Sequence, residues 1–191
     1  MLNPYLAEVV AREQNNDRLR QVEQSRLADG QPLCVRPVTP NDTALLADLI
    51  GRLSETARWM RYFRPLPSAE LIWQEASQVT RREPQLGVAL VATVSESSQV
   101  CAIALAELAH DPAEPAAAEV AVLVHDDAQR KGVGTLLLQE IIALARQRNV
   151  RTLRATLQAE NRAARQLLRK LALAYHAEIH HGELSIWAEL P

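Results

Sequence analysis

The stretch AEVAVLVHDDAQRKGVGTLLLQEII, residues 118–142, decides the fold that we expect for this chain. Its first part alternates valine with alanine and leucine, which favours a β-strand over residues 116–124. Its last part repeats leucine and isoleucine at helical spacing, which predicts a helix over residues 135–148. A polar turn with two glycines joins the two parts. A strand that enters a helix in this way is typical of α/β proteins.

The glycine turn, residues 129–135, suits a ligand that carries phosphate. Gly132 and Gly134 let the backbone approach a ligand closely, and the first N–H groups of the following helix have no acceptor within that helix. These N–H groups and the positive end of the helix dipole attract anions, and Arg130 and Lys131 add positive charge. Neither G-x-G-x-x-G nor G-x-x-x-x-G-K-[ST] fits the turn, so we expect neither a dinucleotide fold nor a P-loop.

Outward from this stretch, helical and strand patterns follow one another along the chain. We expect strands over residues 33–37, 87–94, 99–109 and 153–157, helices over residues 41–50, 68–79 and 161–174, and a hairpin over residues 175–190. Asn41 and Ser68 are expected to cap the helices that follow them. The proline-containing segment 111–118 is interpreted as a connection. The order predicts a mixed α/β fold.

Residues 1–30 are predicted to form an N-terminal helical extension in front of a domain that spans residues 31–191. Apolar side chains fall on one face at the start of this segment, and its polar continuation keeps helical spacing as far as Asp29. The apolar stripe would otherwise be exposed to water. We therefore expect it to pack on the domain or on a second copy of the chain in a homodimer.

The composition is that of a folded protein with no strong overall charge. The 191 residues are 48% hydrophobic and 23% charged, and the formal net charge is -2. No global positive field would therefore recruit nucleic acid or an anionic membrane. No apolar run is long enough for a membrane helix, which points to the cytoplasm. Cys34 and Cys101 form no metal-binding or redox pair by spacing, so we expect buried thiols in a reducing compartment and no metal.

The motif Q-x-x-G-x-G, which begins at Gln129 after a valine-rich strand, resembles the acetyl-CoA-binding motif of the GNAT superfamily of N-acetyltransferases. The similarity continues through RTLRATL and Asn161 to about Leu171. Upstream, RPVTPNDTALLADLIGRLSETARWMRYF is similar to the start of the GNAT domain of bacterial protein-lysine acetyltransferases of the Pat type. The resemblance implies a GNAT fold with splayed central strands and transfer of an acetyl group from acetyl-CoA to a primary amine, foremost a protein lysine. A small-molecule amine as acceptor, or an acyl-CoA-binding sensor without turnover, is the alternative.

The resemblance also implies where acetyl-CoA would bind. The strand that carries residues 121–124 would diverge from its neighbour, so that its free backbone groups pair with pantetheine. An N–H group near Val124 would then face the thioester oxygen as an oxyanion donor. Asn161 fits equally well as a carrier contact and as a helix cap. The residues implied to contact acetyl-CoA are Leu123, Val124, Gln129, Arg130, Lys131, Gly132, Val133, Gly134, Thr135 and Asn161.

Glu119 is our candidate for the general base. A free lysine has a pKa near roughly 10.4, so a base must remove its proton before the amine can attack. Glu119 opens the diverging strand among apolar residues, which would raise the pKa of its carboxyl, and it matches the glutamate of the Pat-type A-E-F-A run. Glu107, within the apolar run CAIALAELA, is the alternative, and His125 at the end of the strand ranks third.

The sequence contains no obvious acid for the leaving thiol. Many members of the superfamily carry N-x-x-A-x-x-x-Y, with the tyrosine as acid, but counting from Asn161 places Leu168 at that position. Thiols ionise near roughly 8.5, so the sulfur can leave as a thiolate without a dedicated acid.

One local cluster would either line the acceptor site or pack helices onto the sheet: Arg58, Trp59, Arg61, Tyr62 and Phe63. His176, His180 and His181 are expected on the surface of the final hairpin.

Overall fold

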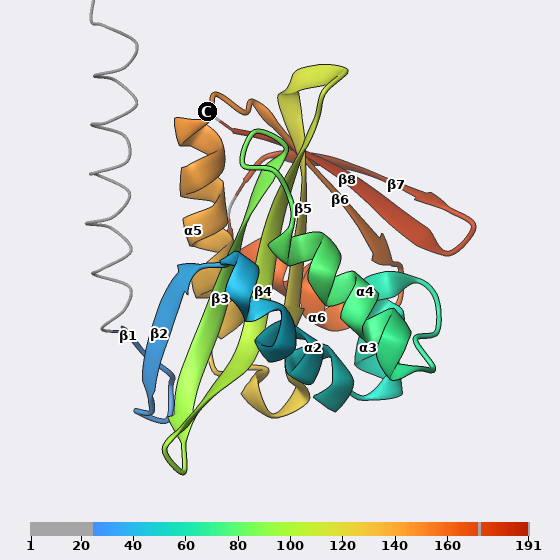
Figure 1. Ribbon diagram of the computed structural model, residues 1–191. Helices are drawn as coiled ribbons and strands as arrows, with labels where there is room; N and C mark the ends of the chain where they lie inside the picture. The colour runs from blue at the N-terminus through green and yellow to red at the C-terminus, as the bar shows by residue number, and fades with distance from the viewer. Residues whose placement is uncertain (1–24, 172, 191) are drawn as a thin grey trace, which may run out of the picture.

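The computed structural model describes residues 25–171 and 173–190, and Figure 1 shows a mixed sheet flanked by helices. The strands are β1 (Ser25–Arg26), β2 (Pro32–Pro37), β3 (Gly87–Glu96), β4 (Gln99–Asp111), β5 (Glu114–Val124), β6 (Thr152–Gln158), β7 (Tyr175–His180) and β8 (Glu183–Glu189). The helices are α2 (Thr43–Arg52), α3 (Glu55–Tyr62), α4 (Ala69–Thr80), α5 (Val133–Gln147) and α6 (Arg162–Lys170). The predicted α/β class is confirmed.

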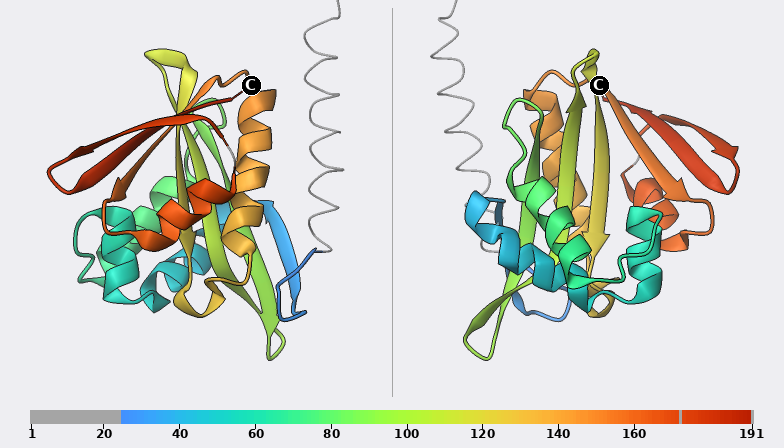
Figure 2. Two further views of the ribbon diagram at one scale, coloured as in Figure 1. Left: turned by 180° about the vertical axis from the view of Figure 1, so that it is seen from behind. Right: turned by 45° about the vertical axis from the view of Figure 1, so that its right-hand side comes forward.

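The eight strands of the described residues form one sheet in the order β1-β2-β3-β4-β5-β6-β8-β7. Helices cover both of its faces, as the two views of Figure 2 show. Neighbouring residues of a strand point to opposite faces, so β4 directs Leu105 into the core under α2 and α4, and Ala106 into the core under α5. Leu49 of α2 and Ile141 of α5 are fully buried in these two cores. Each such side chain contributes about 1.5–3 kcal/mol to folding.

β5 and β6 separate part-way along their length. They pair in parallel only where residues 117–119 face residues 152–154, although β5 continues to Val124 and β6 to Gln158. β5 stays paired with β4 along this whole stretch. Figure 2 shows the two strands diverging. The predicted splay of the central strands is therefore confirmed, and among the described residues it leaves one edge of β5, over residues 120–124, without a neighbouring strand.

Residues 25–30, which we expected in the helical extension, form a strand and a turn instead. Ser25 pairs with Leu33 of β2, and the chain reverses at Gly30, whose φ is 85°. Leu27 is buried in the core under α5. This burial and the pairing with β2 override the helical spacing of the sequence. The rest of the expected extension, residues 1–24, lies outside the described residues, so the division of the chain at residue 30 stays a prediction.

Asp42, and not Asn41 as we expected, is the N-cap residue of α2, but its side chain makes no capping hydrogen bond to that helix and instead bonds to residues before it. The Asp42 carboxylate accepts hydrogen bonds from the Thr39 N–H group at 2.7 Å and from two Arg36 N–H groups at 2.8 and 2.6 Å. The Arg36 hydrogen bonds are the main reason why the pKa of Asp42 falls to about 2, against the opposing effect of its burial. Ser68 caps α4, as predicted.

Three other segments differ from the sequence prediction. Helix α3 was not expected; it has only eight residues, and Ser54 caps it. Much of the segment 111–118 is strand, since β5 already begins at Glu114. Its alanines pair with β4 and β6, and this tertiary pairing outweighs their helical preference. The helix after Asn161 ends at Lys170 and not at residue 174.

Candidate active site

The glycine turn joins the end of β5 to the start of α5, as predicted. Gly132 directly precedes α5 with a φ of 92°, a left-handed conformation that favours glycine. Gly134 serves close packing, because a Cβ atom there would lie 3.3 Å from Cγ2 of Val124. The helix can therefore begin close against the end of the strand. Its first N–H groups have no acceptor within the helix, which leaves them available to an anion.

The peptide groups at the end of β5 alternate between β4 and the open edge. The His125 N–H group donates to the carbonyl oxygen of Ile103 at 2.8 Å, so the N–H group of Leu123, two residues earlier, also faces β4. The N–H groups of Val122 and Val124 then face the side from which β6 has diverged. Gln129 reaches back to this edge, since its Nε2 donates to the Val124 carbonyl at 3.3 Å.

The other predicted residues of the turn differ in the charge and the exposed atoms that they present to a ligand. Lys131 is held by Asp29, with Nζ 2.8 Å from Oδ2, and this hydrogen bond is the main reason why the pKa of Asp29 is lowered. Arg130 is exposed and has a φ of 64°. Val133 is buried, so only its backbone is available to a ligand, whereas Thr135 is half-buried in the first turn of α5. Lys131 therefore offers less free charge than the sequence indicated.

Asn161 caps α6, as one of its two predicted roles requires. Its Oδ1 accepts a hydrogen bond from the Ala164 N–H group at 3.0 Å. Its contact with the carrier stays a prediction. Leu168, which stands where many superfamily members have tyrosine, is half-buried on α6.

Glu119 lies at the fork where β5 leaves β6. It pairs with Ala109 of β4 and with Arg154 of β6, and it is the last residue of β5 with a partner on both sides. Its side chain is exposed, so the apolar surroundings that we expected are not present. The charge of Arg61, on α3, interacts with Glu119.

Glu107, the alternative base, is buried and bound to two arginines. Its Oε1 lies 2.6 Å from an Arg61 nitrogen and its Oε2 lies 3.1 Å from an Arg82 nitrogen. Both carboxylate oxygens are therefore engaged by guanidinium groups. His125, the third candidate, accepts a hydrogen bond from the Asp127 N–H group at 3.3 Å and so caps the short 3-10 turn Asp126–Ala128.

Comparison with known proteins agrees with this arrangement. The profile described as "Acetyltransferase (GNAT) family" matches residues 53–172, which is more than half of the chain. The chain belongs to the GNAT acetyltransferase family. Acetyl-CoA is the acetyl donor that this family implies.

Several solved structures resemble the chain along most of its length. The GNAT domain of S. lividans PAT is 26% identical, with a TM-score of 0.75, over 87% of this chain and 95% of that one. A GNAT-family acetyltransferase from Streptococcus pneumoniae is 17% identical, with a TM-score of 0.63, over 83% and 98%. A cAMP-binding acyltransferase from Mycobacterium smegmatis is 19% identical, with a TM-score of 0.57, over 92% and 52%. Curated proteins gave no sequence match.

Helix α3 of this GNAT protein lies over the fork and contacts both β5 and β6. In the predicted aromatic and arginine cluster, Arg61 forms an ion pair with Glu107 of β4. The Cζ atom of Arg61 lies 5.0 Å from the centre of the Tyr62 ring. Burial is the main reason why the pKa of Tyr62 is raised, which keeps the phenol neutral. Arg58 donates instead to the Gly51 carbonyl at 3.2 Å, and Trp59 is exposed. Tyr62 therefore has the predicted packing role, since it packs against the core under α2 and α4, whereas the lining of an acceptor site by this cluster stays a prediction.

Sequence reasoning missed a link between helix α3 of this acetyltransferase and the segment just before its glycine turn. The carboxylate of Asp126, just before the turn, accepts hydrogen bonds from the Ser54 N–H group at 3.0 Å and from the Ser54 hydroxyl at 2.7 Å. Ser54 is also the N-cap of α3. Burial alone would raise the pKa of Asp126, but the Ser54 hydrogen bonds outweigh it and the pKa is lowered. The two residues are 72 positions apart, so no local pattern reveals the contact.

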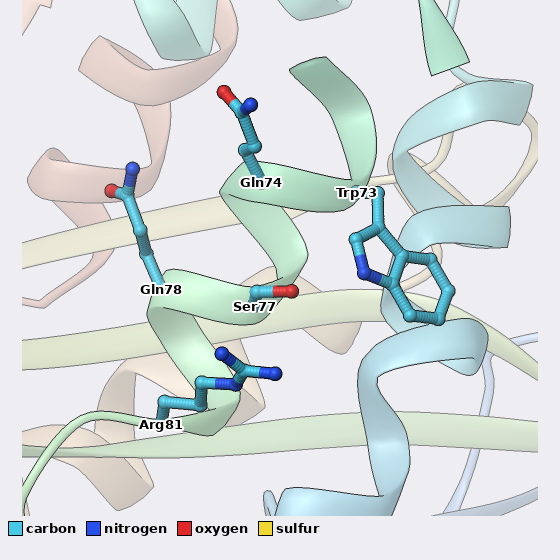
Figure 3. A pocket seen from close by; sticks show the side chains of 5 residues that line it. All are labelled: Trp73, Gln74, Ser77, Gln78 and Arg81. Atoms are coloured by element: carbon cyan, nitrogen blue, oxygen red, sulfur yellow. The ribbon is translucent and has the colours of Figure 1, made fainter. Parts of the chain in front are cut away.

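Two surface hollows of this acetyltransferase lie away from the predicted site residues. Figure 3 shows the first, lined on α4 by Trp73, Gln74, Ser77, Gln78 and Arg81. The second is lined by Gln85, Leu86, His110, Pro112, Pro115 and Arg148. Across residues 25–171 and 173–190, no three His, Cys, Asp or Glu side chains gather as metal ligands would. Within the same residues, none of the helices is both long and apolar enough to span a membrane.

Proposed function

We propose that this acetyltransferase transfers the acetyl group of acetyl-CoA to a lysine side chain of a protein. Glu119 is the general base, and the Val124 N–H group is the donor to the thioester oxygen. The observation that carries this proposal is the fork between β5 and β6. It gives one unpaired strand edge with a carboxylate at its start and a free N–H group beside the glycine turn at its end.

The residues of the glycine turn fit the carrier. Val124 and Gly134 are so close that a Cβ at position 134 would crowd the strand, which leaves the first N–H groups of α5 beside the open edge of β5. These N–H groups and those of residues 130–132 would hold the pyrophosphate, and the exposed Arg130 would add positive charge. When bound, acetyl-CoA supplies the thioester whose carbonyl carbon is attacked.

Groups of the chain itself then remove the proton of the lysine and stabilise the negative charge on the thioester oxygen. Glu119 takes a proton from the lysine ammonium, the neutral amine forms the C–N bond, and the C–S bond breaks. The Val124 N–H group stabilises the oxygen while it carries negative charge, which elsewhere is worth roughly 3 kcal/mol. At about 3.3 Å per residue, Val122 and Val124 lie roughly 10 and 17 Å along the strand from Glu119, so the proton reaches Glu119 through water. With Leu168 in place of tyrosine, the sulfur leaves as a thiolate.

Two observations favour a protein lysine as the acceptor. The first is the likeness to the GNAT domain of S. lividans PAT, together with the Pat-type run that ends in α3. The second is the exposure of Glu119 at the fork, where a side chain presented by a large partner can reach it from outside. A lysine has a long, unbranched stem that suits such an approach.

The test is incubation of the full-length protein with labelled acetyl-CoA and a cell extract, followed by mass spectrometry of proteins and small molecules. Labelled lysine in proteins is the expected result. Gly134→Val, which closes the gap to Val124, should remove both the labelling and the rise in melting temperature that acetyl-CoA causes. Label found only on small amines would show that the acceptor is wrong. No label on any product, with binding intact, would contradict catalysis itself.

A further inference from the structure

Strand β7 forms a free edge of the sheet that residues 25–171 and 173–190 build. It is the last strand in the order β1-β2-β3-β4-β5-β6-β8-β7, and its six residues are all exposed. Figure 1 shows the β7–β8 hairpin extending from the body of the molecule. Proteins usually protect such an edge with lysine, proline or a bulge, because an unpaired strand pairs readily with another chain. The sequence of β7, YHAEIH, contains neither lysine nor proline, and its register with β8 is regular.

Alternate residues of β7 direct their backbone groups outward. The strand joins β8 through a two-residue turn at His181 and Gly182, and the Glu189 N–H group donates to the Ala174 carbonyl at 3.2 Å. In an antiparallel pair, hydrogen-bonded residues recur every second position, so the even-numbered residues of β7 bond to β8. Tyr175, Ala177 and Ile179 therefore present three N–H and three C=O groups to the free edge.

The side chains of the same three residues extend an apolar surface to this edge. Tyr175 is 48% exposed and Ile179 is 62% exposed. Tyr175 and Ala177 pair directly with Ala188 and Ile186 of β8, which are buried, so they lie on the same face of the sheet as the core. The apolar face thus continues outward from the core and ends in water.

The opposite face of β7 carries a charge pattern. Glu178 lies between His176 and His180, with its oxygens 2.9 and 3.2 Å from their Nε2 atoms. The three side chains are well exposed, at 67% for His176, 48% for Glu178 and 70% for His180. A neighbouring strand would therefore meet a negative group with a histidine two residues away on either side.

We propose that β7 pairs antiparallel with β7 of a second copy of this chain, about a two-fold axis at Ala177. This register places Ala177 opposite itself, Tyr175 opposite Ile179 of the partner subunit, and His176 opposite Glu178 of the partner subunit. All three outward residues become hydrogen-bonded pairs, which gives six backbone hydrogen bonds. The sheet then runs continuously through both copies, and the interface is isologous.

Other registers are less favourable. An axis at Glu178 places two carboxylates directly opposite each other, and an axis at His176 does the same with two imidazoles, while each forms fewer backbone hydrogen bonds. An axis at Ile179 runs past the end of the strand at His180. Of these registers, only the axis at Ala177 places alanine opposite alanine, tyrosine opposite isoleucine and histidine opposite glutamate. Because the strand is complementary to itself in this register, we infer that a second copy occupies the edge.

The test measures the monomer–dimer equilibrium of the full-length protein by analytical ultracentrifugation. The wild type should form dimers, and Ile179→Lys should weaken them at least about tenfold, since a lysine at an edge opposes pairing. Ala177→Pro removes only an outward N–H group and should have a similar effect. Val100→Lys, at a side chain that is 60% exposed on β4, is the matched control and should leave the dimer unchanged.

A charge exchange distinguishes this register from other uses of the same edge. Glu178→Lys alone should weaken the dimer, and His176→Glu added to it should restore the dimer, because the acid and base are opposite again. Melting temperature with acetyl-CoA reports whether each variant is folded. A wild type that stays monomeric at the highest concentration reached would overturn the proposal. So would dimers that survive Ile179→Lys, which changes an exposed side chain alone.

Discussion

The glycine turn and a charged cluster at the fork, which consists of Arg61, Arg82, Glu107 and Glu119, are built in opposite ways. The turn is one continuous segment between a strand and a helix, and its geometry follows from two glycines. The cluster draws on α3, β4, β5 and the segment that follows α4. The glycine turn is therefore encoded locally, whereas the charged cluster exists only once the sheet has formed.

Glu119→Gln tests the cluster with the largest expected effect. If Glu119 accepts the proton, its amide cannot, and kcat should fall by about 10²–10⁴-fold while acetyl-CoA still binds. The measurement is steady-state acetylation of a lysine peptide at neutral pH, with thermal shift as the binding check.

Glu107→Gln is the matched comparison for that measurement. Its carboxylate is bound to Arg61 and Arg82, so the substitution should lower the melting temperature and should reduce the rate less than Glu119→Gln does. An undiminished rate in Glu119→Gln would assign the base to another group.

Val124→Pro tests the open edge of β5. The proline removes an N–H group that faces away from β4, so the ladder with β4 keeps its hydrogen bonds. If this group binds the thioester oxygen, kcat should fall by about 10²–10³-fold, as on loss of an oxyanion donor elsewhere. Val122→Pro removes the equivalent group two residues closer to Glu119, and a larger loss there would move the donor to Val122.

The sequence predicted correctly the features that depend on residues close together in the chain. The strand, the glycine turn and α5 lie where their patterns indicated, and Asn161 caps α6 as one of its predicted roles required. The solvent exposure of Glu119 and the two arginines on Glu107 were not predicted, because they depend on which strands and helices meet. The strand at Ser25 was missed for the same reason, since its partner Leu33 lies beyond a turn.

Asp42 extends the comparison to a charge whose partners are all near it in sequence. Its folded pKa of about 2 lies below the ordinary value, so it stabilises the fold when ionised. That contribution, about 2 kcal/mol, is complete above about pH 5 and is lost as the pH falls from about 4 towards 2. Denaturant unfolding across this range should show the loss. Asp42→Asn should flatten it, and Asp48→Asn, an exposed carboxylate on α2, should not.

Asp126 connects the two regions, and its removal should have the smallest effect. Its two hydrogen bonds from Ser54 are exposed and should together be worth about 1 kcal/mol. Asp126→Ala should therefore lower kcat/KM for the acceptor by about three- to tenfold through the position of α3, with little change in acetyl-CoA affinity.

A double-mutant cycle with Ser54→Ala separates this link from a general loss of stability. Ser54→Ala removes the hydroxyl bond to Asp126 and the N-cap of α3 but keeps the Ser54 N–H bond, so a coupled pair should give a double variant that is less impaired than the sum of the two single losses. Additive losses in the cycle would mean that the glycine turn and α3 act independently. In that case the glycine turn and α3 would be connected only through the sheet that carries them.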